Sequence, residues 1–388
     1  MGMFLLCTFL MIILYPLGID LYLVAVPRIA QTLQGSEAQI HTAFSIYLLG
    51  MAATVLPGGM LADRHGRRPV VLGGALIFVV ASLVAAEATG IAQFYLGRFW
   101  QGVGAGALYI MTFTVLRDVL SQARLAMALS LINGVICVIP VLAPVLGYLI
   151  LSHFEWRGIF VGMALVAAIS ALVNLRLLKE TRPARQPAGA SPLALLGTAP
   201  FMQRALLTSA SVAAILVYVS VSPFVLMTTF GLPPEQYTRL MMAMAGVSMS
   251  ASFLTPLLLR WLGKARVLAL SHLAYLLALL ALLCSSGPEG GLSWLLAGCA
   301  LVCIGFSCGF GVAMGEALDV CGDQVASASA LLCIMQIGLS GLFIWGMGHL
   351  GMPALWMLIL ALLLALLGYL VVKVLLPWRA IRRVRARG

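Results

Sequence analysis

The sequence turns abruptly from apolar to charged in one short stretch, Gly59-Met60-Leu61-Ala62-Asp63-Arg64-His65-Gly66-Arg67-Arg68-Pro69. Long apolar runs lie on both sides of it. An arginine or aspartate at the centre of a bilayer costs about 2.5 to 3.5 kcal/mol on insertion scales, so these charges must lie at a membrane surface. Gly66 permits a sharp turn, and Pro69 can begin a helix without a backbone N–H donor. The stretch is therefore predicted to be a tight loop between two membrane-spanning helices.

The composition of the chain is that of a membrane protein. Of the 388 residues, 62% are apolar and 9% are charged, and the mean hydropathy is +1.09. A soluble protein of this length needs more polar surface, so a soluble fold is excluded. The run from Leu355 to Val372 has no charged residue, which favours a helix over the alternating pattern of a membrane β-barrel. We therefore expect an all-α membrane protein.

Twelve apolar runs are each long enough to cross a membrane, which takes about 20 helical residues. They form two groups of six, at 1–178 and 203–376, separated by a linker at 179–202 that is expected to be flexible. Residues 377–388 form a basic cytoplasmic tail, for which binding to anionic lipid is favoured over binding to a protein. The predicted fold has twelve transmembrane helices in two pseudo-symmetric six-helix bundles.

The two halves also contain a similar turn. When Gly263 is laid over Gly66, the segment from Leu258 to Lys264 matches the segment from Leu61 to Arg67 as a weaker basic turn with a glycine. Its place in the second half is the one that a duplication predicts. Two related halves with a site between them are typical of transporters.

The basic residues predict the topology. The formal net charge is +11. If the first helix leaves from the cytoplasm, most Lys and Arg fall in cytoplasmic loops, whereas Arg28, Arg157 and Arg239 fall on the other side and Arg98 lies within a helix. This positive-inside bias places both termini in the cytoplasm and accounts for the charge without a nucleic-acid partner. The apolar stretch from Met3 to Val26 is too long for a signal peptide and is expected to be a retained first helix.

Asp20 lies deep in the first predicted span, in Tyr15-Pro16-Leu17-Gly18-Ile19-Asp20-Leu21-Tyr22. An ionisable residue inside a membrane is costly and therefore indicates function. Burial disfavours the charged form, which suits Asp20 to take up and release a proton. The alternatives are a neutral acid hydrogen-bonded to a neighbouring helix and an acid at the outer interface.

Arg98 lies early in the fourth span and is followed by Gln101, Gly102 and Gly106. Its permanently charged guanidinium, with an amide three residues later, can organise a hydrogen-bond network or influence Asp20. The glycines allow another helix to approach closely. The alternative is that Arg98 only extends to the outer interface.

Several residues in the spans are candidates for contact with a substrate. Pro140 and Pro144 bend the fifth span and Gly147 permits close packing, although a bend can be purely structural. Aromatic, Met and Asn side chains can line an adaptable pocket, with a place in the core, in lipid or in an interhelical hydrogen bond as the alternative. These candidates are Tyr22, Tyr47, Tyr109, Met111, Asn133, Tyr218, Phe224 and Phe310.

The sequence has no recognisable catalytic or metal motif. It lacks a G-x-x-x-x-G-K-[ST] loop for ATP, an H-E-x-x-H motif and a catalytic triad. The 8 cysteines have no zinc-site spacing and are interpreted as packing residues. For Glu316 and Asp319, a position near the membrane surface is favoured over a second proton site. We expect no enzymatic activity, no cofactor and no metal.

The stretch Gly59-x-Leu61-Ala62-Asp63-Arg64-x-Gly66-Arg67-Arg68 resembles the signature loop between the second and third helices of the major facilitator superfamily. With Arg98-x-x-Gln101-Gly102-x-Gly104 and Ala143-Pro144-x-x-Gly147, the chain resembles the twelve-helix drug:proton antiporters, especially the bicyclomycin and chloramphenicol resistance group. Those antiporters usually have glycine where this chain has Ala143 and Tyr148.

The resemblance implies a multi-pass protein of the bacterial inner membrane that exports drugs by alternating access as protons enter. Asp20 would match the acid of the first helix and Arg98 the arginine of the fourth, and both would couple the proton. Asp63 is expected to hold a cytoplasmic gate shut by pairing with Arg117 or by facing the start of the eleventh helix, with a loop needed only for orientation as the alternative. The gate residues would be Gly59, Asp63, Arg64, Gly66, Arg67, Arg117 and Asp118.

Two other functions compete with drug export. One is transport of a metabolite such as a sugar or an amino acid. The other is a membrane sensor, which is disfavoured because the chain has no sizeable soluble domain to carry a signal. The expected partners are small-molecule drugs, protons and the lipid bilayer, and the protein is expected to act as a monomer.

Overall fold

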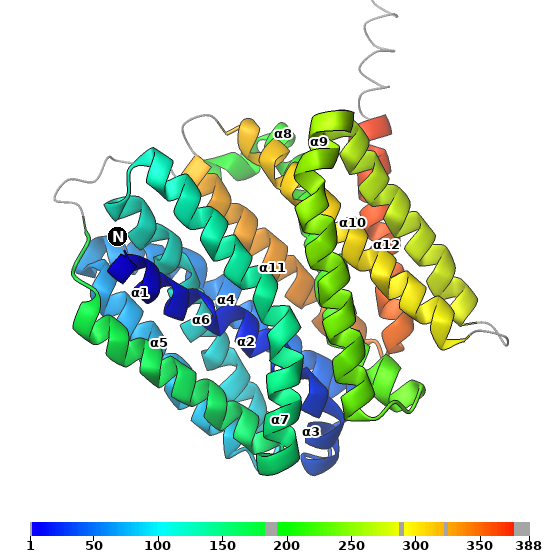
Figure 1. Ribbon diagram of the computed structural model, residues 1–388, viewed down its shortest axis with the longest axis horizontal. Coiled ribbons are helices and arrows are strands. Elements are labelled where there is room, and N and C mark those ends of the chain that lie inside the picture. Colours follow the sequence, from blue (N-terminus) through cyan, green and yellow to red (C-terminus); the bar gives the residue numbers. More distant parts are fainter. Residues whose placement is uncertain (1, 183–191, 287–290, 322–324, 376–388) are drawn as a thin grey trace, which may run out of the picture. The chain divides into compact units, whose positions relative to one another are not determined.

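The computed structural model describes residues 2–182, 192–286, 291–321 and 325–375 (Figure 1). Every regular element in these ranges is a helix. Residues 183–191 of the predicted linker and the predicted basic tail at 377–388 lie outside the described residues. The side chain of Asn133, a substrate candidate, also lies outside them.

Ten helices in the described ranges are long and apolar enough to cross a membrane. Two of these, α7 (Gln122–Leu177) and α9 (Pro234–Ser285), contain 56 and 52 residues, about twice the length that one crossing needs. Their backbones leave the helical conformation at Glu155, with φ of 57°, and at Gly263, with φ of 79°. Each of the two helices therefore comprises two crossings, and the prediction of twelve transmembrane helices is confirmed.

The first crossing is broken into short pieces. They are α1 (Gly2–Ile12), α2 (Leu14–Asp20), the 3-10 helix η1 (Leu23–Ala25) and α3 (Val26–Thr32). Pro16 and Pro27 lack the N–H donor that an unbroken helix needs at these positions. The break after Asp20 leaves Leu21 and Tyr22 outside regular helix.

Three long helices follow, α4 (Glu37–His65), α5 (Arg67–Ala86) and α6 (Ile91–Val119). Ser36 and Gln39 form a capping box at the start of α4, with Ser36 Oγ accepting from Gln39 N at 3.3 Å and Gln39 Oε1 accepting from Ser36 N at 2.8 Å. On α6, Gly102 and Gly106 allow α4 to pack closely, since a Cβ at Gly106 would lie 2.6 Å from Met51 O. The close approach predicted for these glycines is confirmed.

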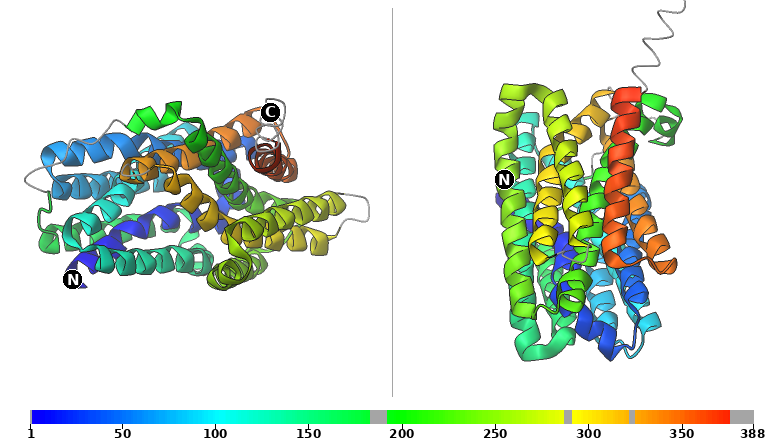
Figure 2. Two further views of the ribbon diagram at one scale, coloured as in Figure 1. Left: turned by 90° about the horizontal axis from the view of Figure 1, so that it is seen from above. Right: turned by 90° about the vertical axis from the view of Figure 1, so that its right-hand side faces the viewer.

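In the second half of the chain, α9 comprises two crossings and the other elements are shorter. In addition to α9, these are η2 (Pro192–Gly197), α8 (Ala199–Pro223), the π-helix η3 (Phe224–Thr229), α10 (Leu292–Asp319), α11 (Val325–His349), α12 (Ala354–Leu370) and the π-helix η5 (Val371–Leu375). The part of α9 after Gly263 packs against α10, where a Cβ at Gly305 would lie 2.6 Å from the ring of Tyr275 (Figure 2).

Contacts divide the chain into two compact units. The first comprises Met1–Ala188, Ser222–Ala245 and Gly341–Gly351, and the second comprises Gly189–Val221, Gly246–Ser340 and Met352–Gly388. Within the first unit, α6 packs against α4 and α5, and α1 and α2 pack against α6 and α7.

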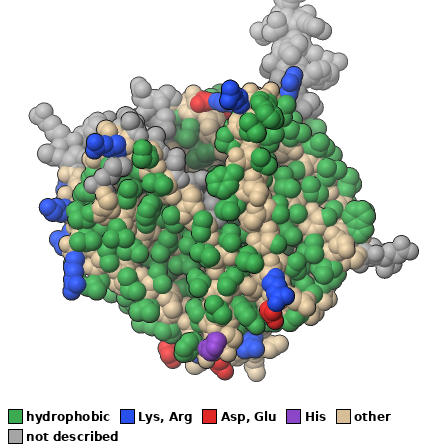
Figure 3. All heavy atoms as spheres, viewed as in Figure 1, with side chains coloured by type: hydrophobic (Ala, Val, Ile, Leu, Met, Phe, Trp, Pro, Cys, Tyr) green, Lys and Arg blue, Asp and Glu red, His purple; other side chains and the backbone are tan. Residues whose placement is uncertain are grey.

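Hydrophobic side chains cover most of the face shown in Figure 3, and the few charged side chains lie mostly toward the edges of this view. Exposed residues in the spans include Leu76, Leu165 and Leu367, each with more than half of its surface accessible. In water such a surface would be unfavourable, whereas hydrocarbon is its natural solvent. The exposed surface is therefore that of a membrane protein.

Candidate functional site

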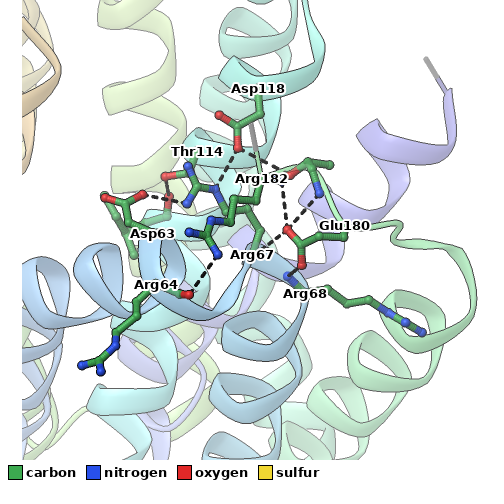
Figure 4. Close-up of polar contacts among 10 residues, drawn as sticks. Asp63, Arg64, Arg67, Arg68, Thr114, Asp118, Glu180 and Arg182 are labelled. Carbon is green, nitrogen blue, oxygen red and sulfur yellow. Dashed lines mark hydrogen bonds and ion pairs between the residues drawn. The ribbon is translucent and has the colours of Figure 1, made fainter. Parts of the chain in front are cut away.

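A cluster of charged side chains surrounds the turn between α4 and α5 (Figure 4). Arg67, the first residue of α5, has only 4% of its surface exposed. Its Nη1 donates to Asp63 Oδ1 at 2.7 Å, and its Nε donates to Asp118 Oδ2 at 2.9 Å. A buried guanidinium is stable only when it is paired, and carboxylates of α4 and α6 provide the pairs. One side chain thus joins three helices.

Glu180, which follows the end of α7, caps the start of α5. The residue before α5 is Gly66, which has no side chain for this purpose. Glu180 Oε1 accepts a hydrogen bond from Arg67 N at 2.8 Å, and Oε2 accepts one from Arg68 N at 3.2 Å (Figure 4). A helix start leaves its first N–H groups without intrahelical partners and carries a partial positive charge, so a carboxylate stabilises it in two ways.

Glu180 is itself held by its neighbours along the chain. Its Oε1 accepts further hydrogen bonds from Thr181 N at 3.0 Å and Arg182 N at 2.9 Å. Partial burial by itself would raise the pKa of Glu180, but the backbone N–H donors together hold this pKa below its ordinary value. Arg182 Nη1 also donates to Arg64 O at 2.9 Å. Residues 180–182 therefore link the end of α7 to α4 and α5.

Gly66 is required at this turn for two reasons. Its φ is +103°, in the region that favours glycine. A Cβ at this position would also collide with the Glu180 carboxylate. The tight turn predicted from the sequence is confirmed, and its glycine makes room for an acid from another part of the chain.

The sequence prediction needs one correction here. The linker at 179–202 is expected to be flexible, whereas the structure bonds Glu180, its second residue, to the start of α5, 113 positions earlier in the chain. No local pattern marks such a long-range cap. The only sequence signal is an acid directly after a span, opposite a helix start that lacks a capping side chain. The pairing of Asp63 with Arg117 or with the eleventh helix stays a prediction, and Arg117 is exposed.

A second polar group lies inside the first unit, around Arg98 on α6. Arg98 is fully buried. Its guanidinium carbon lies 4.5 Å from the ring centre of Tyr22 and 4.4 Å from that of Tyr47. Nη2 donates to Gly18 O at 2.9 Å, and Nη1 donates to Gln101 Oε1. Aromatic faces and carbonyl oxygens thus surround the cation, which does not extend to an interface.

Asp20 lies in the same region, at the end of α2 and directly before the break in the first crossing. It is buried, with 7% of its surface exposed. Gly147 on α7 approaches the break so closely that a Cβ there would collide with Leu21 O. Arg98 also donates to the carbonyl of Gly18, two residues before Asp20. Asp20, the break and Arg98 therefore lie in one buried region of the first unit. Burial among the helices of the first unit explains the position of Asp20 without placing it at the outer interface.

The remaining predicted residues are divided between the two units. In the first unit, Met111 is fully buried. The ring centre of Tyr109 lies 5.4 Å from that of Tyr15 and 5.0 Å from that of Phe113. The ring centre of Phe224 lies 4.8 Å from that of His41. In the second unit, Tyr218 is buried on α8 and Phe310 on α10 stacks on Phe306. Gly59 on α4 has open space beside it.

The acids near the end of α10 both have basic partners in the second unit. Glu316 Oε2 accepts from Lys373 Nζ, and Asp319 Oδ2 accepts from Lys264 Nζ at 3.0 Å. Both side chains of the second pair are more than three fifths exposed. A charge pair near a helix end fits the favoured interpretation of these acids better than a proton site does.

Comparison with known proteins identifies the family. The model of the Major Facilitator Superfamily matches residues 8–335, which is most of the chain. The chain belongs to the Major Facilitator Superfamily. Members of this superfamily are transporters, so the expectation that the protein is not an enzyme is confirmed.

Curated relatives within the superfamily are similar over nearly their whole length. Multidrug resistance protein MdtL of Klebsiella pneumoniae (strain 342) is 45% identical over 364 residues, covering 92% of each chain. Multidrug resistance protein MdtL of Escherichia coli O81 (strain ED1a) is 44% identical over 369 residues, covering 94% of this chain and 93% of that protein. The predicted family resemblance is confirmed.

Solved structures of superfamily transporters share the fold. A D-xylose-proton symporter superposes with a TM-score of 0.76 at 14% identity, covering 96% of this chain and 97% of that chain. A bacterial homologue of the human lysosomal transporter Spinster, in an inward-facing and unoccupied conformation, gives 0.74 at 17% identity, covering 96% of both chains. At these identities the likeness concerns the fold alone, and it confirms the predicted major facilitator fold.

Proposed function

We propose that this protein is a multidrug efflux transporter that exports small, mostly apolar compounds from the bacterial cytoplasm in exchange for protons. The relatives named multidrug resistance protein MdtL support this, at 44% to 45% identity over more than nine tenths of the chain. The alternative of a metabolite transporter has no comparable support. Both termini are assigned to the cytoplasm by the positive-inside bias, and the transporter works as a monomer.

The observation that carries proton coupling is the burial of Asp20 beside the break in the first crossing. Gly18, two residues earlier, accepts a hydrogen bond from Arg98, so a permanent cation is anchored to the segment that ends in a buried acid. Protonation of Asp20 removes its negative charge and weakens its attraction to Arg98. Leu21 and Tyr22, which are outside regular helix, are where the segment can adjust to that change.

Coupling then follows from the difference between the two protonation states. A proton shifts a conformational equilibrium only as far as its affinity differs between the two conformations. Asp20 binds a proton more tightly in the conformation that opens it to the outside, and releases it in the conformation that opens it to the cytoplasm. Drug and proton therefore exchange by alternating access, with drug contacts provided by the aromatic and Met side chains near Tyr22, Tyr47 and Met111.

The cluster around Arg67 is assigned the role of a cytoplasmic lock. Its bonds from Arg67 to Asp63 and Asp118, and from Glu180 to the start of α5, hold the ends of four helices together. Such a lock favours one conformation without taking part in proton transfer. Loss of the lock is therefore expected to slow transport without abolishing the coupling itself.

The test is drug-induced proton movement in inverted membrane vesicles, across a panel of drugs, sugars and amino acids. The wild type is expected to respond to apolar drugs. Asp20→Asn and Arg98→Gln are expected to reduce the response to background at equal protein amounts. Arg204→Gln is the matched control, because Arg204 is partly exposed and donates to the Pro200 carbonyl of its own helix. A response to sugars or amino acids alone would contradict drug export, and normal coupling in Asp20→Asn would exclude the assigned proton site.

A further inference from the structure

Ser82, a fully buried residue of α5, contacts Gln101 of the polar group around Arg98. Its Oγ donates to Phe78 O of its own helix at 2.7 Å. A hydroxyl has one hydrogen, so the remaining capacity of Ser82 Oγ is that of an acceptor. Gln101 Nε2 of α6 lies 2.8 Å away and donates to it.

Gln101 is fully buried and its amide has two distinct ends. Nε2 carries two N–H donors, which are directed to Ser82 Oγ and, at 3.3 Å, to Met163 Sδ of α7. Oε1 accepts from Arg98 Nη1. Arginine has only donors, so an amide turned by half a rotation would set donor against donor on the Arg98 side. On the other side it would set Oε1 against a hydroxyl whose hydrogen is already used.

We propose that Ser82 is a positioning residue for proton coupling: by accepting only from Gln101 Nε2, it directs the Gln101 carbonyl to Arg98 and so orients the guanidinium toward Gly18 and the Asp20 segment. The inference rests on the proposed coupling role of Arg98. Ser82 touches neither the proton nor the drug, and acts through Gln101 alone. Met163 is a weak acceptor and does not fix the amide by itself.

The chain of contacts runs across three helices. Ser82 Oγ donates its hydrogen to the Phe78 carbonyl and accepts a hydrogen bond from Gln101 Nε2. Gln101 Oε1 in turn accepts a hydrogen bond from Nη1 of Arg98. Nη2 is then left to the Gly18 carbonyl, which lies next to the break in the first crossing. Every side chain in this series is fully buried, so water does not compete for the same bonds.

The experiment measures drug-induced proton movement in inverted vesicles as a function of pH for Ser82→Ala, Gln101→Ala and the double variant. Ser82→Ala is expected to lower the rate about fivefold to tenfold and to shift the pH of half-maximal response by about half a unit to one unit, the effect of losing one buried hydrogen bond. The double variant is expected to be no worse than Gln101→Ala, since Ser82 acts only through Gln101. Ser82→Thr retains the hydroxyl and is expected to restore the wild-type pH profile.

Ser45→Ala is the matched control. Ser45 of α4 is also fully buried, and its hydroxyl donates to carbonyls of its own helix, to His41 O at 3.0 Å and Thr42 O at 2.9 Å. Its removal is expected to leave the pH profile unchanged. If Ser82→Ala does not yield folded protein, Ser82→Cys, whose thiol is a much poorer acceptor than the hydroxyl, must show the same direction of shift.

Two outcomes overturn the inference: an unchanged pH profile in Ser82→Ala or Ser82→Cys, and additive losses in the double variant. Arg98→Gln separates this from failure of the proposed function. If Arg98→Gln abolishes coupling while Ser82→Ala does not alter it, only the role of Ser82 is wrong. If Arg98→Gln transports normally, the coupling role of Arg98 is wrong as well.

Discussion

The turn between α4 and α5 and the turn inside α9 have nearly the same backbone and very different surroundings. Gly66 has φ of 103° and ψ of 162°, and Gly263 has φ of 79° and ψ of 163°. Each glycine is followed by a basic residue that pairs with an acid near the end of a later helix, Arg67 with Asp118 and Lys264 with Asp319. The turn that the sequence comparison predicted in the second half is therefore present.

The difference lies in burial and in the number of partners. The Arg67 and Asp118 side chains are 5% and 11% exposed, whereas those of Lys264 and Asp319 are 63% and 62% exposed. Arg67 has a second acid in Asp63, and Glu180 fills the space beside Gly66. Beside Gly263, no other part of the described chain lies within 4 Å of an added Cβ. The two turns share a backbone conformation, but only the turn at Gly66 is surrounded by a buried cluster of bonded charges.

The largest effect is expected from removing the basic residue of each turn. Arg67→Met leaves the largely buried Asp118 carboxylate without its cationic partner and should lower the free energy of unfolding by about 3 to 5 kcal/mol. Lys264→Met breaks an exposed pair and should cost about 1 kcal/mol at most. Thermal unfolding in detergent, with ligand and lipid held constant, measures both. Equal losses would show that the two turns are energetically alike and would contradict the comparison.

Substitution of the glycines is expected to have an intermediate effect. Gly66→Ala introduces both backbone strain and a collision with Glu180, and should destabilise the protein by about 2 to 4 kcal/mol. Gly263→Ala introduces the strain without the collision, and should cost about 1 kcal/mol. The same unfolding measurement distinguishes them. The double variant Gly66→Ala with Glu180→Ala should recover part of the loss, and no recovery would mean that Glu180 is not the obstacle.

The smallest effect is expected from Glu180→Gln, because Glu180 is exposed. A neutral amide weakens the cap of α5, and the loss should be about 0.5 to 1 kcal/mol at neutral pH. Because the folded protein holds the pKa of Glu180 below its ordinary value, the stabilisation is present above the ordinary carboxyl range and disappears as the pH falls through the lowered pKa. Wild type and Glu180→Gln should therefore converge in stability as the pH falls from about 5 to about 3.

The control for this pH dependence is Glu235→Gln. Glu235 lies in the first turn of α9 and pairs with Arg239 on the same helix, with both side chains more than half exposed. Its substitution should change stability little at either pH. A constant difference between wild type and Glu180→Gln across the pH range would exclude the cap as its source.

Local features of the sequence predicted much of this arrangement. The apolar runs predicted the twelve crossings because a helix must satisfy its backbone within itself in hydrocarbon. The acid and the arginine inside spans marked Asp20 and Arg98, because charged groups are rare at such positions. The glycine between two charged groups marked the turn at Gly66, which has the positive φ that this residue type allows.

The amino-acid sequence alone predicts the class of protein, the number of crossings and the residues whose burial in a membrane needs an explanation. Each of these follows from local composition and spacing. The folded structure alone shows that Glu180 caps α5, that Arg67 is buried between two acids, and that Ser82 and Gln101 are hydrogen-bonded in series to Arg98. These bonds join residues distant in the chain, and they form only when packed helices bring donor and acceptor within about 3 Å at a suitable angle.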